Sequence, residues 1–225
     1  MRISLVVPTL NEEKNIAATV AAIRDLQPDE LLIVDGGSTD QTPEICRGLG
    51  LNVLSSPRSR STQMNLGAER ATGDVLLFLH ADTRLPPSAL DDIRAAMNDR
   101  RCPGGRFDIK LDGDHWMLKI VGAMISFRSR ITKVATGDQA IFVRRDVFKA
   151  IGGYPDIPLM EDIALSRVLR RVGRVACLRS RVITSGRRWE IEGIWRTIFK
   201  MWTLKSLYLL GVSPVRLKRY YADGR

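Results

Sequence analysis

Two acidic side chains stand directly after apolar runs that are typical of buried β-strands. The run 31–34 leads into Asp35 and Gly36, and the run 75–79 leads into a segment that ends at Asp82. In open α/β folds the carboxyl ends of parallel strands form the ligand-binding edge of the sheet. A single aspartate at a strand end often only caps a turn. The pair instead predicts a site for a polar ligand, with a divalent metal.

The elements that position these residues alternate regularly through the first half of the chain. We expect strands at 3–7, 31–34, 52–54 and 75–79, and helices at 12–27, 43–48, 62–71 and 87–98, the first of them capped by Asn11. The second half is less regular, with expected strands at 106–111, 140–143 and 174–184 and helices at 116–127, 161–171 and 191–210. This order predicts an α/β fold with a mostly parallel central sheet and helices on both faces.

Charge and cysteine content narrow the class of protein. The net charge of +10 and the pI near 10.0 indicate an anionic partner, which leaves nucleic acid, a membrane surface and a phosphorylated substrate open. Three widely spaced cysteines argue against a disulfide framework or structural zinc and favour a reducing cytoplasm. We expect no signal peptide and no membrane-spanning segment, since no run reaches about 18 apolar residues.

The loop after the first strand argues against two nucleotide-binding classes. Residues 8–13 are Pro-Thr-Leu-Asn-Glu-Glu, without the glycines on which dinucleotide-binding folds seat a pyrophosphate. A P-loop is missing from the sequence, and so is the glycine-rich basic loop that nucleotidyltransferases carry. No nucleic-acid-binding module is recognisable, so nucleic acid is not expected as a partner.

An ordered set of motifs resembles the family 2 glycosyltransferases of the GT-A fold. The set consists of VVPTLNE at 6–12, VDGGSTD at 34–40, QMNLGA at 63–68, ATGD at 71–74, FLHAD at 78–82, GDQA at 137–140 and the acid pair at 161–162. It covers residues 3 to about 190. The segment SGRRWE at 185–190 is similar to small bacterial members assigned to arsenosugar biosynthesis.

The resemblance implies a site for a nucleoside-diphosphate sugar, with UDP preferred. The residues implied to bind this donor are Pro8, Thr9, Asn11, Glu12, Asp35, Gly36, Arg58, Arg60, Asn65, His80, Ala81 and Asp82. Asp35 would accept hydrogen bonds from the base. Arg58 or Arg60 would contact the base or the phosphates, or else both lie in a solvated loop.

The segment 80–82 takes the place of the family's DxD motif and implies Mg²⁺ or Mn²⁺ as cofactor. Its first acid is replaced by His80, so Asp82 is expected to do most of the metal binding, with water and phosphate oxygens completing the shell. A bound ion would neutralise charge on the departing nucleoside diphosphate.

The acid pair has two readings. Glu161 and Asp162 could simply complement a helix dipole. The resemblance implies instead that Asp162 is the general base of an inverting transfer, with Glu161 as the second choice. It further places Asp138, Gln139, Arg187, Arg188 and Trp189 on the acceptor side.

We therefore expect a GT-A domain at 1–190, with a nucleotide-sugar half at 1–100 and an acceptor half at 101–190, followed by an amphipathic helix and basic tail at 191–225. The acceptor class stays open between a small metabolite, a lipid and a polysaccharide. The helix at 191–210, with Ile191, Ile194, Trp195, Ile198, Phe199 and Trp202 on one face, would pack on the domain, form a homodimer interface, or contact a membrane surface from the cytoplasmic side. The alternative function is a non-catalytic basic module that binds anionic membrane or nucleic acid.

Overall fold

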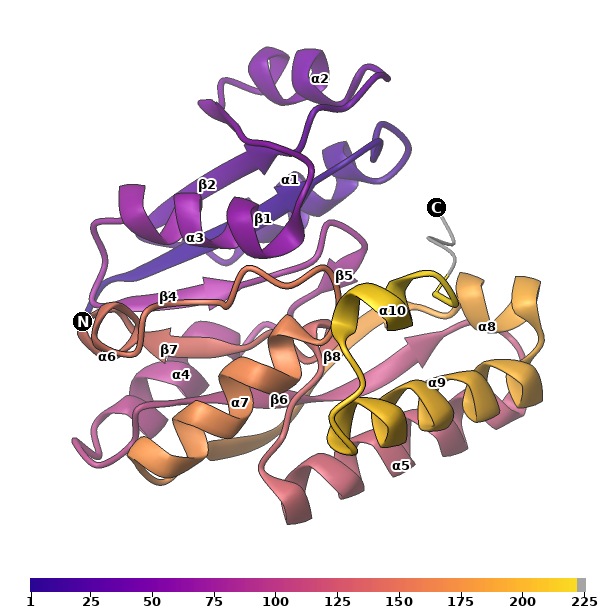
Figure 1. Ribbon diagram of the computed structural model, residues 1–225. Helices are drawn as coiled ribbons and strands as arrows, with labels where there is room; N and C mark the ends of the chain where they lie inside the picture. Colours follow the sequence, from indigo (N-terminus) through magenta and orange to yellow (C-terminus); the bar gives the residue numbers. More distant parts are fainter. Residues whose placement is uncertain (222–225) are drawn as a thin grey trace.

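The computed structural model of the protein describes residues 1–221 and has three layers, with helices on both faces of one sheet (Figure 1). The strands are β1 Ile3–Thr9, β2 Glu30–Asp35, β3 Val53–Ser55, β4 Val75–Phe78, β5 Thr83–Arg84, β6 Gly104–Asp112, β7 Phe142–Arg144 and β8 Ala176–Ser185. The α-helices are α1 Ile16–Asp25, α2 Thr42–Gly48, α3 Arg60–Arg70, α4 Ala89–Met97, α5 Trp116–Thr132, α6 Arg145–Ala150, α7 Glu161–Val172, α8 Arg187–Glu192, α9 Ile194–Leu209 and α10 Pro214–Lys218. A 3₁₀ turn, η1, spans Gly137–Gln139.

The eight strands are ordered β3-β2-β1-β4-β7-β6-β8-β5. Strands β1 to β4 pair in parallel, whereas β7 pairs antiparallel with both β4 and β6. In the β4–β7 ladder Leu77 lies opposite Phe142 and Val75 opposite Arg144, so β7 begins where β4 ends. The turn before β7 therefore reaches the same edge of the sheet as the carboxyl ends of β1, β2 and β4.

Side-chain alternation along the strands divides the core between the two faces of the sheet. Leu5 and Leu77 pack with residues of α1, α2, α4 and α5, while Val6 and Leu76 pack with residues of α3, α6 and α7. Successive strand residues point to opposite faces, and both faces here are covered, so the strands read as continuous apolar runs. The expected fold class, a mostly parallel sheet covered on both faces, is confirmed.

Several expected element boundaries differ in the structure. Asn11 has φ +54° and does not cap α1, which begins only at Ile16. The single helix expected at 191–210 is divided at Gly193, whose φ of +83° lets the chain turn between α8 and α9. Ala140, at φ +48°, ends η1 and delays β7 to Phe142. The short elements β5, α6, η1 and α10 were not expected from the sequence. Within residues 1–221 we find no helix that is both long and apolar enough to cross a bilayer.

Candidate active site

The loops that follow β1 and β2 are bonded to each other. The Asn11 N–H donates to Ser38 Oγ at 2.9 Å, and Asn11 Oδ1 accepts from the Thr39 N–H at 2.8 Å. The Glu12 N–H donates to Thr42 Oγ1 at 2.8 Å. Two of the residues expected to line the nucleoside pocket, Asn11 and Glu12, thus lie against the glycine turn that follows Asp35.

Asp35 is buried at the end of β2 and organises that turn. Its Oδ2 accepts the backbone N–H groups of Gly37 and Ser38, both at 2.9 Å. Its Oδ1 accepts the hydroxyls of Ser38 at 2.5 Å and Thr9 at 3.3 Å. The carboxylate therefore holds Thr9 and the turn together, and its contact with a base remains a prediction.

Gln63 is a site residue that the sequence analysis missed. Its buried amide donates to the carbonyl oxygens of Thr9 and Val34, both at 2.8 Å, where β1 and β2 end. A Cβ added at Gly36 would lie 2.9 Å from Gln63 Cδ, which explains the glycine there. The motif at 63–68 was recognised, but a buried glutamine bonded to two strand ends leaves no mark in spacing or periodicity.

Asn65 forms a clamp on the loop that precedes α7. Its Nδ2 donates to the Tyr154 carbonyl at 2.8 Å and its Oδ1 accepts the Tyr154 N–H at 2.9 Å. The side chain expected to contact the donor thus ties α3 to the approach of Glu161. Arg58 is exposed in the loop before α3.

Arg60, Asp82, Glu161 and Asp162 come together although they belong to three separate segments of the chain. Burial alone would lower the pKa of Arg60, but the nearby carboxylates of Glu161, Asp162 and Asp82, together with Tyr221, outweigh burial and raise it. Arg60 is therefore a permanent positive charge among three carboxylates. The expected phosphate-side arginine thus lies near enough to the metal-side acid and the candidate base for their charges to act on it.

His80 and Asp162 meet at the first residue of η1. The Gly137 N–H donates to Asp162 Oδ2 at 2.7 Å. A Cβ at Gly137 would lie 2.8 Å from His80 Nε2 and 3.8 Å from Asp162 Oδ2, so a larger residue there would displace the His80 ring. Helix α1 holds the loop that carries His80, because the Thr19 hydroxyl donates to the carbonyl of buried Ala81 at 2.5 Å.

The pKa values of both members of the acid pair, Glu161 and Asp162, are raised. Burial raises the pKa of Asp162, and the hydrogen bond from Gly137 and the charge of Lys205 offset this only in part. Burial, and after it the charge of Asp162, raises the pKa of Glu161. Met160, directly before them, has φ +69°, a strained conformation for a bulky residue. Such strain is concentrated at functional sites.

Two cations next to the acid pair were not foreseen. Burial lowers the pKa of Lys205 on α9 to about 8, helped by the charge of Arg128 and opposed by Asp162 and Asp138. Burial also lowers the pKa of Arg128 on α5. Arg128 Nε and Nη2 and Asp138 Oδ1 are buried without a hydrogen-bond partner among residues 1–221.

The residues expected on the acceptor side divide into two groups. Gln139 is fully buried, with its amide donating to the Phe107 carbonyl at 3.1 Å and to Ser129 Oγ at 3.0 Å, so it supports η1 from inside rather than facing a ligand. Arg188 lies over the ring of Tyr221, 4.5 Å from its centroid, and donates to its hydroxyl.

The remaining two residues flank Arg188 in α8. Arg187 is exposed, while Trp189 is half-buried and packs against the core. Tyr221 thus connects Arg188 to the neighbourhood of Arg60.

The residues present fit a magnesium or manganese ion that is shared with a phosphate ligand. Within residues 1–221 no three His, Cys, Asp or Glu side chains form a ready-made cage. Asp82 is exposed, lies at the binding edge of the sheet and is close enough to Arg60 to raise its pKa. Mg²⁺ usually binds through one or two carboxylates together with water and substrate phosphates, and Asp82 offers that kind of ligand.

Comparison with known proteins gives one family. The model of glycosyl transferase family 2 matches residues 4–152. A glycosyltransferase of PGL/p-HBAD biosynthesis from Mycobacterium bovis is 31% identical over 164 residues, which is 67% of this chain and 62% of that protein. The chain thus spans less than two thirds of the length of this relative.

Solved structures share the fold at lower identity. The mannosyltransferase PcManGT from Pyrobaculum calidifontis, in complex with GDP-Man and Mn²⁺, has a TM-score of 0.65 and 18% identity over 81% of this chain and 56% of its own. S. aureus TarS 1–349, in complex with UDP-GlcNAc, has a TM-score of 0.63 and 20% identity over 82% of this chain and 58% of its own.

Proposed function

Because this chain belongs to glycosyl transferase family 2, we propose that it transfers a sugar from a nucleoside-diphosphate donor to an acceptor hydroxyl, with inversion at the anomeric carbon. The observation that carries the proposal is the cluster of Arg60, Asp82, Glu161 and Asp162 at the carboxyl edge of the sheet. Family membership makes sugar transfer the better account than a non-catalytic basic module.

The donor would lie across the loops after β1, β2 and β4. Among nucleotides we expect UDP. One structural relative, TarS, was solved with UDP-GlcNAc, and another, PcManGT, with GDP-Man and Mn²⁺. Asp82 would hold the divalent ion against the diphosphate, and Arg60 would contribute a positive charge that does not depend on pH. When bound, the ion would act as a Lewis acid toward the leaving diphosphate.

Asp162 is the proposed general base. Its raised pKa makes its carboxylate a stronger proton acceptor than an exposed aspartate, which suits removal of a hydroxyl proton. The Gly137 N–H fixes Oδ2 at 2.7 Å and so holds the carboxylate in one orientation. The positive charge of Lys205 opposes this rise in pKa and so favours the ionised form of Asp162. Direct displacement by the activated hydroxyl inverts the anomeric centre.

The acceptor would approach from the side of η1, α8 and α9. Asp138, Arg188 and Lys205 supply charge there, and the acceptor class stays open between a small metabolite, a lipid and a polysaccharide. The finer placement among arsenosugar enzymes, the division at residue 190, the cytoplasmic location and a homodimer all remain predictions.

The test is the release of nucleoside diphosphate from a panel of UDP- and GDP-sugars, with Mg²⁺ or Mn²⁺ present. We expect turnover of one donor class, and a loss of about 10²–10⁴-fold in Asp162→Asn. Asp91→Asn is the matched control, since Asp91 is exposed on α4, where its side chain forms an ion pair with Arg94 at 3.2 Å. If Asp162→Asn and Asp91→Asn turn over the donor at the same rate, Asp162 is not the base.

A further inference from the structure

Helix α5 turns an apolar stripe toward solvent. Trp116, Ile120, Met124, Phe127 and Ile131 recur at intervals of three and four residues and are exposed by 64%, 48%, 53%, 62% and 66%. A surface helix of a globular protein normally buries its apolar stripe and exposes its polar one. Helix α5 buries one apolar face, with Leu118 and Val121 in the core, and exposes this second apolar stripe as well, which indicates that a further partner covers this side.

Helix α9 carries a second stripe of the same kind. Trp195, Phe199 and Trp202 are exposed by 64%, 68% and 63%. Ile194 and Ile198 instead pack inward on the core, and Ile191 belongs to α8, so the six residues expected to share one helix face do not share it.

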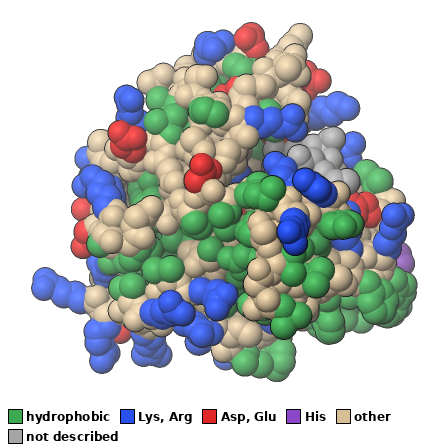
Figure 2. Space-filling view, in the orientation of Figure 1, with side chains coloured by type: hydrophobic (Ala, Val, Ile, Leu, Met, Phe, Trp, Pro, Cys, Tyr) green, Lys and Arg blue, Asp and Glu red, His purple; other side chains and the backbone are tan. Residues whose placement is uncertain are grey.

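The two helices lie side by side along the same edge of the molecule (Figure 1). At one end Trp116 and Trp195 line a common hollow of about 740 Å³. Toward the other end, Lys205 of α9 is close enough to Arg128 of α5 for the charge of Arg128 to lower the pKa of Lys205. Figure 2 shows hydrophobic side chains gathered over this edge, at the lower right of the view. We call the two stripes together the α5–α9 face.

Within the two segments that form the α5–α9 face the charge has a single sign, while two acids, Asp114 and Glu190, lie at one end of it, in the hollow that Trp116 and Trp195 line. Residues 115–137 and 193–221 contain no aspartate or glutamate. They contain ten lysines and arginines, of which six are exposed: Lys119, Lys133, Arg196, Arg216, Lys218 and Arg219. Exposed tryptophan beside basic side chains is typical of surfaces that lie in the headgroup region of a bilayer.

We propose that the α5–α9 face binds the surface of an anionic bilayer, with both helices lying flat on it. This deepens the membrane contact expected from the C-terminal helix alone, because α5 supplies five of the eight exposed apolar side chains of the face. A second copy of the chain fits less well. A two-fold interface places the same patch on both subunits, so cations would face cations with no acid of either segment between them. The proposal does not depend on the proposed sugar transfer.

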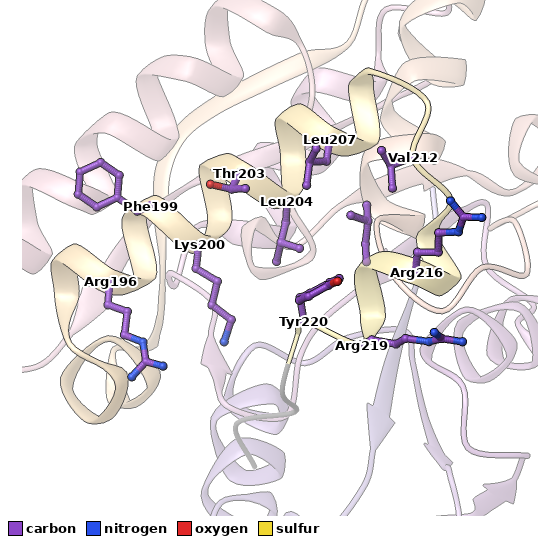
Figure 3. A pocket seen from close by; sticks show the side chains of 11 residues that line it. Arg196, Phe199, Lys200, Thr203, Leu204, Leu207, Val212, Arg216, Arg219 and Tyr220 are labelled. Carbon is purple, nitrogen blue, oxygen red and sulfur yellow. The ribbon is translucent and has the colours of Figure 1, made fainter.

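A hollow of about 870 Å³ between α9 and α10 supports a lipid partner (Figure 3). Arg196, Arg216 and Arg219 line it together with Leu204, Leu207 and Phe199. Of these residues, Phe199 also belongs to the α5–α9 face, and Arg196 is an exposed cation next in sequence to Trp195 of the same face. Guanidinium groups next to hydrocarbon match a phosphate headgroup and the start of its acyl chains. The hollow thus lies where a lipid at the edge of the face would enter.

The experiment is flotation of the purified chain with phosphatidylcholine vesicles, with and without phosphatidylglycerol, together with tryptophan emission. We expect flotation and a blue shift only with phosphatidylglycerol, because three of the four tryptophans lie on the face and each basic residue near an anionic surface strengthens binding about fivefold. The double variants Trp195→Ser with Phe199→Ser, and Ile120→Ser with Phe127→Ser, should each weaken binding about tenfold or more.

The control is Val168→Ser with Val172→Ser, which removes exposed apolar side chains from α7 and should leave binding unchanged. Circular dichroism confirms that each variant is folded. Absence of flotation by folded wild type overturns the proposal, and so does equal loss in the control. A wild-type dimer in light scattering that Trp195→Ser makes monomeric, without any vesicle binding, assigns the face to a second copy instead.

Discussion

Replacing Lys205 by methionine should stabilise the protein at neutral pH and weaken its activity. Lys205 has a pKa of about 8 in the fold against an ordinary value of 10.5, mainly because burial opposes its charge. That difference corresponds to about 3 kcal/mol by which the folded state disfavours the ammonium. Methionine keeps a similar length without the charge. We therefore expect Lys205→Met to raise the free energy of unfolding at pH 7 by about 2–3 kcal/mol.

The sign of the pH dependence makes this prediction specific. Below pH 8 the ammonium is charged in both states, so wild type bears the whole penalty. Between about 8 and 10.5 the unfolded chain holds more protons than the fold, so wild-type stability rises with pH and the advantage of the variant shrinks toward zero. The loss of a positive charge beside Asp162 should at the same time slow sugar transfer, because that charge helps to keep the base ionised.

The assay is urea unfolding at several pH values, with Lys110→Met as control, since Lys110 is exposed on β6 and should change little at any pH. An advantage of Lys205→Met that is equal at pH 7 and pH 10, or no advantage at either, would refute the burial argument.

Asp162→Asn should melt at a higher temperature than wild type near pH 7, because burial raises the pKa of Asp162 and ionisation above its ordinary range costs stability; an unchanged melting temperature would contradict this. Asp108→Asn should lose about 3–5 kcal/mol in urea unfolding, since the carboxylate is 1% exposed and pairs with the buried Arg106. Asn65→Ala should lose about 1–3 kcal/mol because both hydrogen bonds to the Tyr154 backbone disappear, and a smaller loss would mean that water replaces the clamp.

The sequence was sufficient where function depends on strand ends. Parallel strands bring their carboxyl ends to one edge, so a strand ending in Asp35 and another followed by Asp82 could be placed there without coordinates. Asp162 could be added because its motif resembled a known family, and Arg60 because a guanidinium suits phosphate, although a solvated loop stayed the alternative. The structure then brings these residues together.

What the sequence could not supply depends on long-range packing. Lys205 and Arg128 come from helices 77 positions apart and carry no motif, so only the packing of α9 beside α5 reveals them. The positive φ of Asn11 follows from its bond to Thr39 in another loop, which local capping rules do not consider. The outward stripe on α5 could not be assigned from the sequence, since this helix is apolar on two faces and only the packing shows which one is buried.

The most direct test of the proposed function is calorimetric titration of UDP into wild type and Asp82→Ala, each with and without Mn²⁺, with GDP, ADP and dTDP for comparison. The account predicts that wild type binds one diphosphate in a metal-dependent manner and that Asp82→Ala loses the metal-dependent part. Folded wild-type protein that binds none of the nucleotides would contradict the proposed donor site. Binding that is the same with and without metal, and the same in Asp82→Ala, would remove Asp82 from its assigned role.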